Sequence, residues 1–163
     1  MPNYKGHLVG GAGAFGILFF ALRSSCNPSL FTGVEWFVFT LAGALFPDID
    51  IKSKGQKYFY WAVLLLFTFL LLKKQFESMA CFSFVIITPM LVKHRGIFHR
   101  FWFVVSMPLL VWSLVAVALP DYSSILFFNT LFFITGGISH IALDMGFTRM
   151  MSNVVSSRRY RKR

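Results

Sequence analysis

The stretch Lys-His-Arg-Gly-Ile-Phe-His-Arg at residues 93–100 is the densest polar cluster in a chain that is otherwise mostly apolar. It holds two of the four histidines, three cations and a glycine. Apart from proline, glycine is the residue least favourable in the interior of a helix. An apolar segment precedes it at residues 79–92, and another follows at residues 101–119. The stretch therefore predicts a polar turn between two membrane helices, at one surface of the bilayer.

The composition of the 163 residues supports a membrane protein with one domain. Hydrophobic residues make up 56% of the chain and charged residues only 13%, and the mean hydropathy is +0.66. Soluble domains carry about a quarter charged residues. Two cysteines, Cys26 and Cys81, are too few for a disulfide framework or a thiolate metal site, and whether they pair stays open.

Apolar segments predict an all-α, polytopic bundle of about six transmembrane helices. They are residues 4–22, 31–46, 58–72, 79–92, 101–119 and 124–143. Several are nearer 15 than 20 residues, short for a hydrocarbon core of about 30 Å, so four helices are the alternative. Residues 23–28 are expected to form a loop. The bundle is expected to be a single domain at residues 1–150, followed by a basic cytoplasmic tail at 151–163.

Six crossings bring the chain back to one side of the bilayer at four segment ends, and the histidines gather there. The polar residues at these ends are His7, Asp48, Asp50, His94, His99, His140 and Asp144. The same side receives 13 of the 16 Lys and Arg residues. By the positive-inside rule this side is cytoplasmic, and both termini lie there. We therefore expect a multi-pass protein of the inner (plasma) membrane with a site that faces the cytoplasm.

Histidine and carboxylate ligands suit zinc, with manganese or iron as alternatives. His140 and Asp144 are four residues apart, so on a helix they share a face and can hold one ion. Asp48 and Asp50 follow a proline and can share an ion or bridge two. All seven residues are predicted ligands of a divalent metal. The alternative for each aspartate alone is a helix cap, a turn or an ion pair, for example with Arg149.

These motifs resemble the YdjM-like family, whose members are described as LexA-binding, inner-membrane-associated and predicted to be metal-dependent hydrolases. The matching elements are His7, Leu-Phe-Pro-Asp-Ile-Asp at 45–50, His-Arg-Gly-x-x-His at 94–99 and Gly-x-x-Ser-His-x-x-x-Asp at 136–144. The resemblance covers residues 6–148. Phe98 and Arg100 depart from it, since the family often has Thr and Ser there. The resemblance implies a metal-dependent hydrolase but specifies no reaction.

The leading interpretation is a hydrolase of phosphoesters or lipid headgroups. Asp48 or Asp50 would bridge ions or act as general base, and Arg95 would hold a phosphate through forked hydrogen bonds. The main alternative is a non-enzymatic interaction protein whose basic tail binds anionic lipid, at about 1 kcal/mol per Lys or Arg.

A divalent-cation transporter is less favoured, because apart from scattered Ser and Thr the segment centres are expected to lack polar groups. No specific nucleic-acid partner is predicted, and the sequence leaves the oligomeric state open. The chain has no nucleotide-binding loop, nucleophile elbow or dinucleotide fingerprint.

Overall fold

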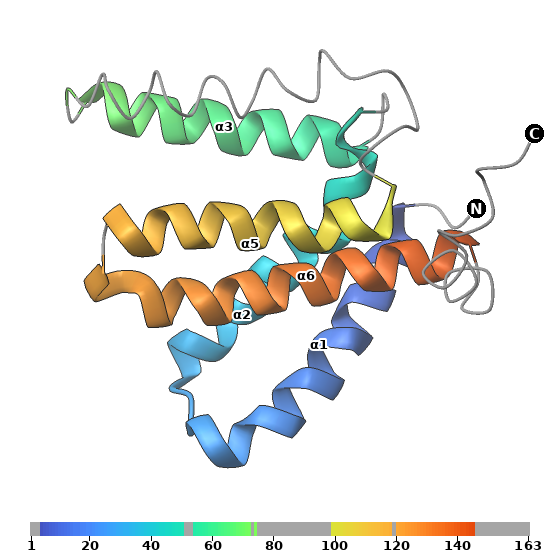
Figure 1. Cartoon of the computed structure of the whole chain (residues 1–163). Coiled ribbons are helices and arrows are strands. Elements are labelled where there is room, and N and C mark those ends of the chain that lie inside the picture. The colour runs from blue at the N-terminus through green and yellow to red at the C-terminus, as the bar shows by residue number, and fades with distance from the viewer. Residues whose placement is uncertain (1–3, 51–53, 73, 75–98, 119, 146–163) are drawn as a thin grey trace, which may run out of the picture.

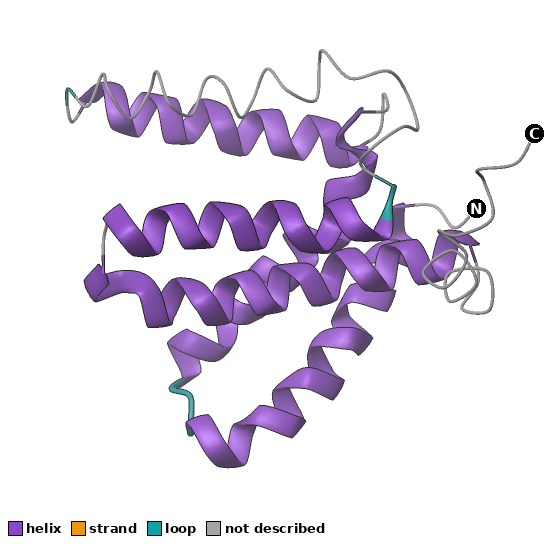
Figure 2. Ribbon diagram, in the orientation of Figure 1, coloured by secondary structure: helices purple, strands orange, loops and turns teal. Residues whose placement is uncertain are grey.

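The structure is a computed structural model that describes residues 4–50, 54–72, 74, 99–118 and 120–145 (Figure 1). Every element within these ranges is helical, which confirms the predicted all-α class for this part of the chain (Figure 2). The elements are α1 (Tyr4–Cys26), α2 (Leu30–Leu45), η1 (Phe46–Asp50), α3 (Lys54–Leu72), α5 (Phe101–Ala118), η2 (Pro120–Tyr122) and α6 (Ser123–Met145), where η denotes a 3-10 helix.

Three stretches of the described residues are long and apolar enough to cross a membrane. They are Tyr4–Cys26, Leu30–Asp48 and Pro120–Met145, and a shorter apolar helix covers Phe101–Val117. The predicted segment at residues 79–92 lies outside the described residues. Six crossings therefore remain a prediction, while a helical protein with several apolar helices of membrane length is what the structure shows.

The turn between α1 and α2 is shorter than the loop expected at residues 23–28, because the helix continues through Cys26. Asn27 then adopts a left-handed conformation with φ of 41°, and its N–H donates to the carbonyl oxygen of Arg23 at 3.0 Å. This closes the helix in the way that asparagine and glycine commonly do. Ser29 caps α2 by accepting from the Thr32 N–H at 3.2 Å.

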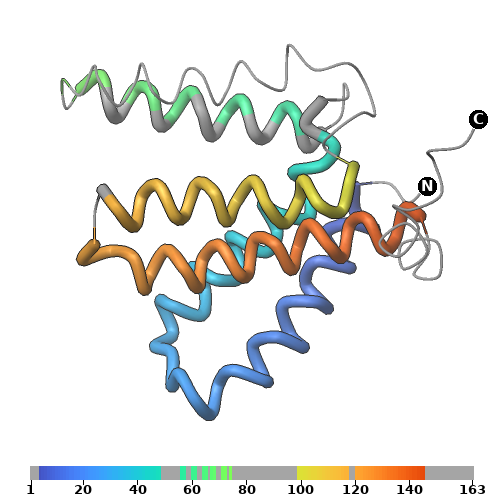
Figure 3. The backbone as a smooth tube through the Cα atoms, viewed as in Figure 1, coloured from blue at the N-terminus to red at the C-terminus, as the bar shows by residue number. Residues whose placement is uncertain are grey.

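Helices α1 and α2 run antiparallel, as do α1 and α6. The ring of His7, near the start of α1, stacks on His140 near the end of α6. Further along α1, Phe15 contacts Phe132, which precedes His140 on α6. The path of the backbone in Figure 3 follows the same arrangement.

Helices α2 and α6 run parallel, and α5 runs antiparallel to α6. Glu35 contacts Asn129 near the beginnings of α2 and α6, and Ala44 contacts His140 near their ends. On α5, Val104 packs against Ile141 and Trp112 contacts Phe127. The beginnings of α1 and α5 and the ends of α2 and α6 therefore meet at one end of the bundle.

Glycines allow α2 and α6 to approach until their backbones touch. A Cβ atom added to Gly136 would overlap the carbonyl oxygen of Thr40, and one added to Gly43 would overlap the carbonyl oxygen of Phe133. Small residues serve this purpose at helix contacts in membranes, where close van der Waals packing holds helices together. This contact fixes the register between α2 and α6.

Aromatic rings fill the interior between the two ends of the bundle. Trp36 stacks on Phe132 with ring centroids 4.7 Å apart, and both side chains are buried. Phe15 contacts Phe132, and Phe128 contacts Trp36. This aromatic layer separates the end that carries the histidines from the opposite end.

A polar pair joins α2 and α6 near their beginnings, outside the segment centres that were expected to lack polar groups. Asn129 of α6 is buried, and its Nδ2 donates to Glu35 Oε1 of α2 at 2.6 Å. A carboxylate within an apolar helix is costly unless it is paired, so the partner on the neighbouring helix explains why Glu35 is tolerated.

Candidate metal centre

Histidines and aspartates from four parts of the fold converge where the helix ends meet. His7 lies in the first turns of α1, and Asp48 lies in η1 directly after α2. His99 precedes α5, and the last turns of α6 supply His140 and Asp144. The sequence brings these residues together because alternating helix directions deliver each of them to the same end of the bundle.

Four of these residues form a group that could hold a metal ion. Each of Asp48, His99, His140 and Asp144 offers one ligand atom, and these atoms all lie within 4.8 Å of one another. His99 Nε2 lies 3.4 Å from Asp48 Oδ1 and 3.8 Å from Asp144 Oδ2. His140 Nε2 lies 3.6 Å from Asp48 Oδ1 and 3.5 Å from Asp144 Oδ2.

The four nitrogen-to-oxygen separations in this group fit a coordinated ion better than they fit hydrogen bonds. Nitrogen-to-oxygen hydrogen bonds have their commonest length near 2.9–3.0 Å. Ligands held about 2.0–2.1 Å from a tetrahedral zinc ion lie about 3.4 Å from one another. The four separations, from 3.4 to 3.8 Å, lie close to that second value.

A backbone hydrogen bond orients the His140 ring for coordination. His140 Nδ1 lies 2.7 Å from the carbonyl oxygen of Ala44, and a carbonyl can only accept, so Nδ1 carries the hydrogen. In the neutral ring Nε2 then presents its lone pair toward Asp48 and Asp144. Nε2 is buried and, within the described ranges, has no hydrogen-bond partner. Metal-ligating histidines are commonly held in this way by a second partner on the other nitrogen.

Two carboxylates and a histidine lone pair that face one another are unfavourable without a cation between them. The side chains of His140 and Asp144 are 0% and 5% exposed, so water screens them little. Asp144 Oδ1 is also buried, and no described residue forms a hydrogen bond with it. Oxygen and imidazole nitrogen together suit zinc, manganese or iron. The residues present therefore fit a divalent ion.

The group is open to solvent on one side. The side chains of Asp48 and His99 are 20% and 17% exposed, whereas His140 on the opposite side is fully buried. Two exposed cations lie nearby in the sequence, because Lys5 precedes His7 by two residues and Arg100 follows His99 directly. A water molecule or an anion would reach the group from the side of Asp48 and His99.

His7 lies beside the group but is not part of it. Its ring stacks on His140 with centroids 3.8 Å apart and 14° between the planes. Its Nε2 lies 3.4 Å from Asp144 Oδ1, whereas His99 Nε2 is paired with the other carboxylate oxygen, Oδ2. The His7 side chain is 2% exposed, and its Nδ1 forms no hydrogen bond with the part of the chain that the structure describes.

The structure thus brings together five of the seven predicted ligands. Asp50 has its backbone in η1, but its side chain is outside the described part of the chain, and His94 and the predicted anion-binding Arg95 lie outside the described residues. The Ala44 carbonyl, which orients the His140 ring, was not predicted from the sequence. Every residue has a backbone carbonyl, so the residue type at position 44 does not indicate this role. The Gly136-Gly137 pair was the available signal, because Gly136 permits the close approach of α2 and Gly137 that of Val104 on α5.

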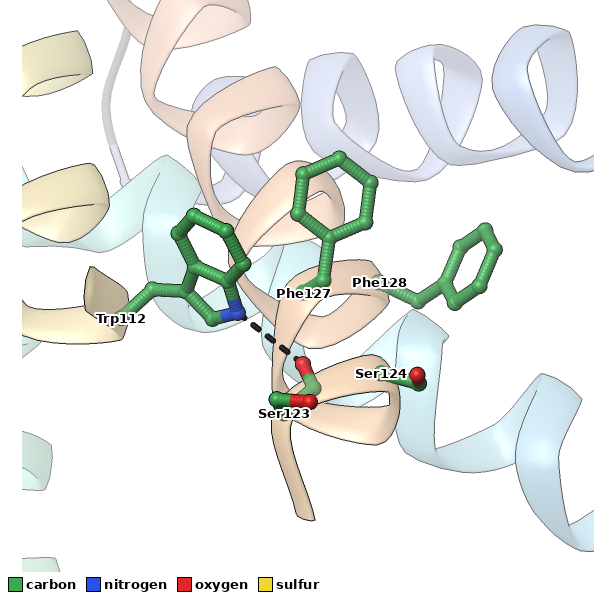
Figure 4. A pocket seen from close by; sticks show the side chains of 5 residues that line it. All are labelled: Trp112, Ser123, Ser124, Phe127 and Phe128. Atoms are coloured by element: carbon green, nitrogen blue, oxygen red, sulfur yellow. Dashed lines mark hydrogen bonds between the residues drawn. The ribbon is translucent and has the colours of Figure 1, made fainter. Parts of the chain in front are cut away.

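A hollow at the opposite end of the bundle has a different character. It lies between α5 and α6, has a volume of about 180 Å³ and is lined by Trp112, Ser123, Ser124, Phe127 and Phe128 (Figure 4). Trp112 Nε1 donates to the carbonyl oxygen of Ser123 at 2.9 Å, so the polar atom of the indole is satisfied. The lining holds no acidic or histidine side chain and suits apolar groups.

Residues 1–150 match the model of a family described as YdjM inner membrane protein. No curated protein and no solved structure matches the chain. The family match covers all five clustered residues, Asp50, His94 and Arg95.

Proposed function

The chain belongs to the YdjM inner membrane protein family, and on this premise we propose that it is a membrane-bound metal-dependent hydrolase. Its centre comprises Asp48, His99, His140 and Asp144 and faces the cytoplasm. The observation that carries the proposal is the group of four ligand atoms within 4.8 Å of one another at the meeting point of the helix ends.

A divalent ion in this group would lower the pKa of a bound water toward about 7 and supply hydroxide at neutral pH. The protein would position the ligands of the ion and shield one side of the centre from water. His140 is held by the Ala44 carbonyl, and its burial excludes water from the rear of the centre. Asp48 and His99 border the open side, where a substrate would enter.

We propose Asp50 as the general base that takes a proton from the attacking water, a role the sequence analysis shared between Asp48 and Asp50. Asp48 lies close to His99 and His140, so its carboxylate would bind the metal and would not act as the base. Asp50 follows it by two residues in η1, which keeps its backbone next to the centre.

Phosphoesters, including lipid headgroups, are the proposed substrates. Arg95 would hold the phosphate through paired hydrogen bonds. The exposed cations Lys5 and Arg100 add positive charge beside His7 and His99. An anionic ester would be attracted to this end of the protein, and the apolar helices would keep it at the membrane surface where lipid headgroups lie.

The aromatic layer argues against the transport of a divalent cation through the described helices. Trp36 and Phe132 are buried and stacked between the metal group and the Glu35–Asn129 pair. An ion that crossed there would lose its water without gaining ligands, which is strongly unfavourable.

Metal content and hydrolysis of phosphoesters, measured on detergent-purified protein, test the proposal. The His140→Ala variant is expected to lose its metal and to lose activity by at least about 100-fold, because changes to groups that merely support ligands already cost about 10–100-fold. Ser139→Ala is the matched control, because Ser139 bonds to the Gly136 carbonyl and belongs to no ligand group. Normal activity in well-folded His140→Ala protein would rule out the proposed mechanism.

A further inference from the structure

The Nε2 atoms of His7 and His140 each face a different oxygen of the Asp144 carboxylate. His140 Nε2 lies 3.5 Å from Asp144 Oδ2, and His7 Nε2 lies 3.4 Å from Asp144 Oδ1. The two rings are nearly parallel and 3.8 Å apart. The carboxylate therefore spans the edges of two stacked imidazoles.

His7 does not fit as one more ligand of the first ion. The atoms of Asp48, His99, His140 and Asp144 all lie within 4.8 Å of one another, and His7 falls outside this set. Its Nε2 instead faces the second oxygen of Asp144, Oδ1, at 3.4 Å.

A hydrogen bond from His7 to Asp144 accounts poorly for the contact. The separation of 3.4 Å is long for a charge-assisted hydrogen bond, which is usually about 2.7–2.9 Å. Asp144 Oδ1 is buried and has no hydrogen-bond partner among the residues that the structure describes. A cation between His7 Nε2 and Asp144 Oδ1 would give the buried carboxylate oxygen a partner.

We propose that a second divalent cation binds between His7 Nε2 and Asp144 Oδ1, so that Asp144 bridges two ions. The inference rests on the first metal centre of the proposed function. Paired metal ions in hydrolytic enzymes lie about 3.5–4 Å apart. The stacked rings of His7 and His140, one ligand for each ion, are separated by 3.8 Å and match that distance.

The second ion specifies the class of substrate more closely. Paired ions stabilise both the attacking and the leaving oxygen of an in-line displacement, which suits phosphate esters. His7 and Asp144 would occupy two coordination positions of the second ion. Its remaining coordination positions would be available for water and for a phosphate oxygen. The wild-type protein is therefore expected to favour phosphoesters over carboxylic esters of similar size.

Full-length protein loaded with Mn²⁺ in lipid nanodiscs tests the inference. We expect about two Mn²⁺ per chain and an electron paramagnetic resonance spectrum of an exchange-coupled pair. His7→Gln should retain one Mn²⁺ and give the spectrum of an isolated ion. Val9→Ala is the matched control, because Val9 is exposed on the same helix, and it should behave as wild type.

A single Mn²⁺ per wild-type chain, or a spectrum without coupling, would overturn the second site. The wild-type measurement alone decides this if His7→Gln fails to fold. Retention of the coupled pair in folded His7→Gln protein would also overturn it and would leave His7 with an orienting role on Asp144. Phosphoester hydrolysis with only one ion would reject the second site and leave the proposed function standing, whereas absence of any bound metal would reject both.

Discussion

His140 Nδ1 donates a hydrogen bond of 2.7 Å to the carbonyl oxygen of Ala44, and this bond joins the candidate metal centre to the packing of α2 against α6. The bond exists because Gly136, one turn before His140, lets α6 lie directly on the backbone of α2. The proposed coordination is thus linked to helix packing through Gly136 and Ala44, neither of which is a proposed ligand.

Substitution of Gly136 by alanine is expected to weaken metal binding although Gly136 is no ligand. The added Cβ would overlap the Thr40 carbonyl oxygen, so α6 must move away from α2. Overpacking of this kind costs about 1–3 kcal/mol of stability. The shift should also lengthen the His140–Ala44 bond and lower metal affinity by about 10–100-fold. Thermal unfolding and metal titration measure the two effects.

Gly13→Ala is the control for this substitution. A Cβ atom at Gly13 would meet nothing within 4 Å, so the same chemical change on an apolar helix should be tolerated. Equal metal affinity in the Gly136→Ala and wild-type proteins would show that the helix contact does not orient the ligand.

Removal of the metal is expected to lower the stability of the wild-type protein. Within the described part of the chain, no Lys or Arg is paired with the buried group of Asp144 and His140, so an ion would relieve the repulsion between their oxygens and nitrogen. A ligand present at 100 times its dissociation constant stabilises the folded state by about 2.7 kcal/mol. Zinc added after chelation should therefore raise the melting temperature of wild-type protein but not of His140→Ala protein. An equal rise in both would indicate binding elsewhere.

The sequence predicted those parts of the candidate site that depend on local periodicity and helix direction. His140 and Asp144 lie four residues apart on one helix, so they share a face whatever surrounds them. Alternating apolar segments bring His7 and Asp48 to the same end of the bundle. The sequence alone could not predict the contact with the Ala44 carbonyl, which depends on the rotation of α2 against α6.

Glu35 and Asn129 could have been found from the sequence. Each is a polar residue within an apolar segment, and a carboxylate in such a segment calls for a partner on another helix. What the sequence could not provide is the register between α2 and α6, since 94 residues separate the two partners along the chain.

Loss of the Glu35–Asn129 hydrogen bond is expected to destabilise the bundle without affecting the metal. Glu35 lies nine residues before Ala44 on α2, about 14 Å along the helix from the centre. Hydrogen bonds between membrane helices average about 0.6 kcal/mol and reach about 1.7 kcal/mol. Asn129→Ala should lose stability of this order and keep its metal. A double-mutant cycle with Glu35→Ala isolates the pair, and a coupling energy near zero would contradict the expectation.

The orientation of the centre can be tested at four exposed positions. Lys5 and Arg100 lie at the end of the bundle with the histidines, and Ser29 and Asp121 lie at the opposite end. Single cysteines at these positions, in a chain whose Cys26 and Cys81 are replaced by serine, are to be labelled in intact cells with a maleimide that does not cross membranes. Since Lys and Arg concentrate on cytoplasmic surfaces, only the Ser29→Cys and Asp121→Cys proteins should react from outside. Labelling of Lys5→Cys and Arg100→Cys instead would place the centre on the outer surface, where cytoplasmic phosphoesters could not reach it.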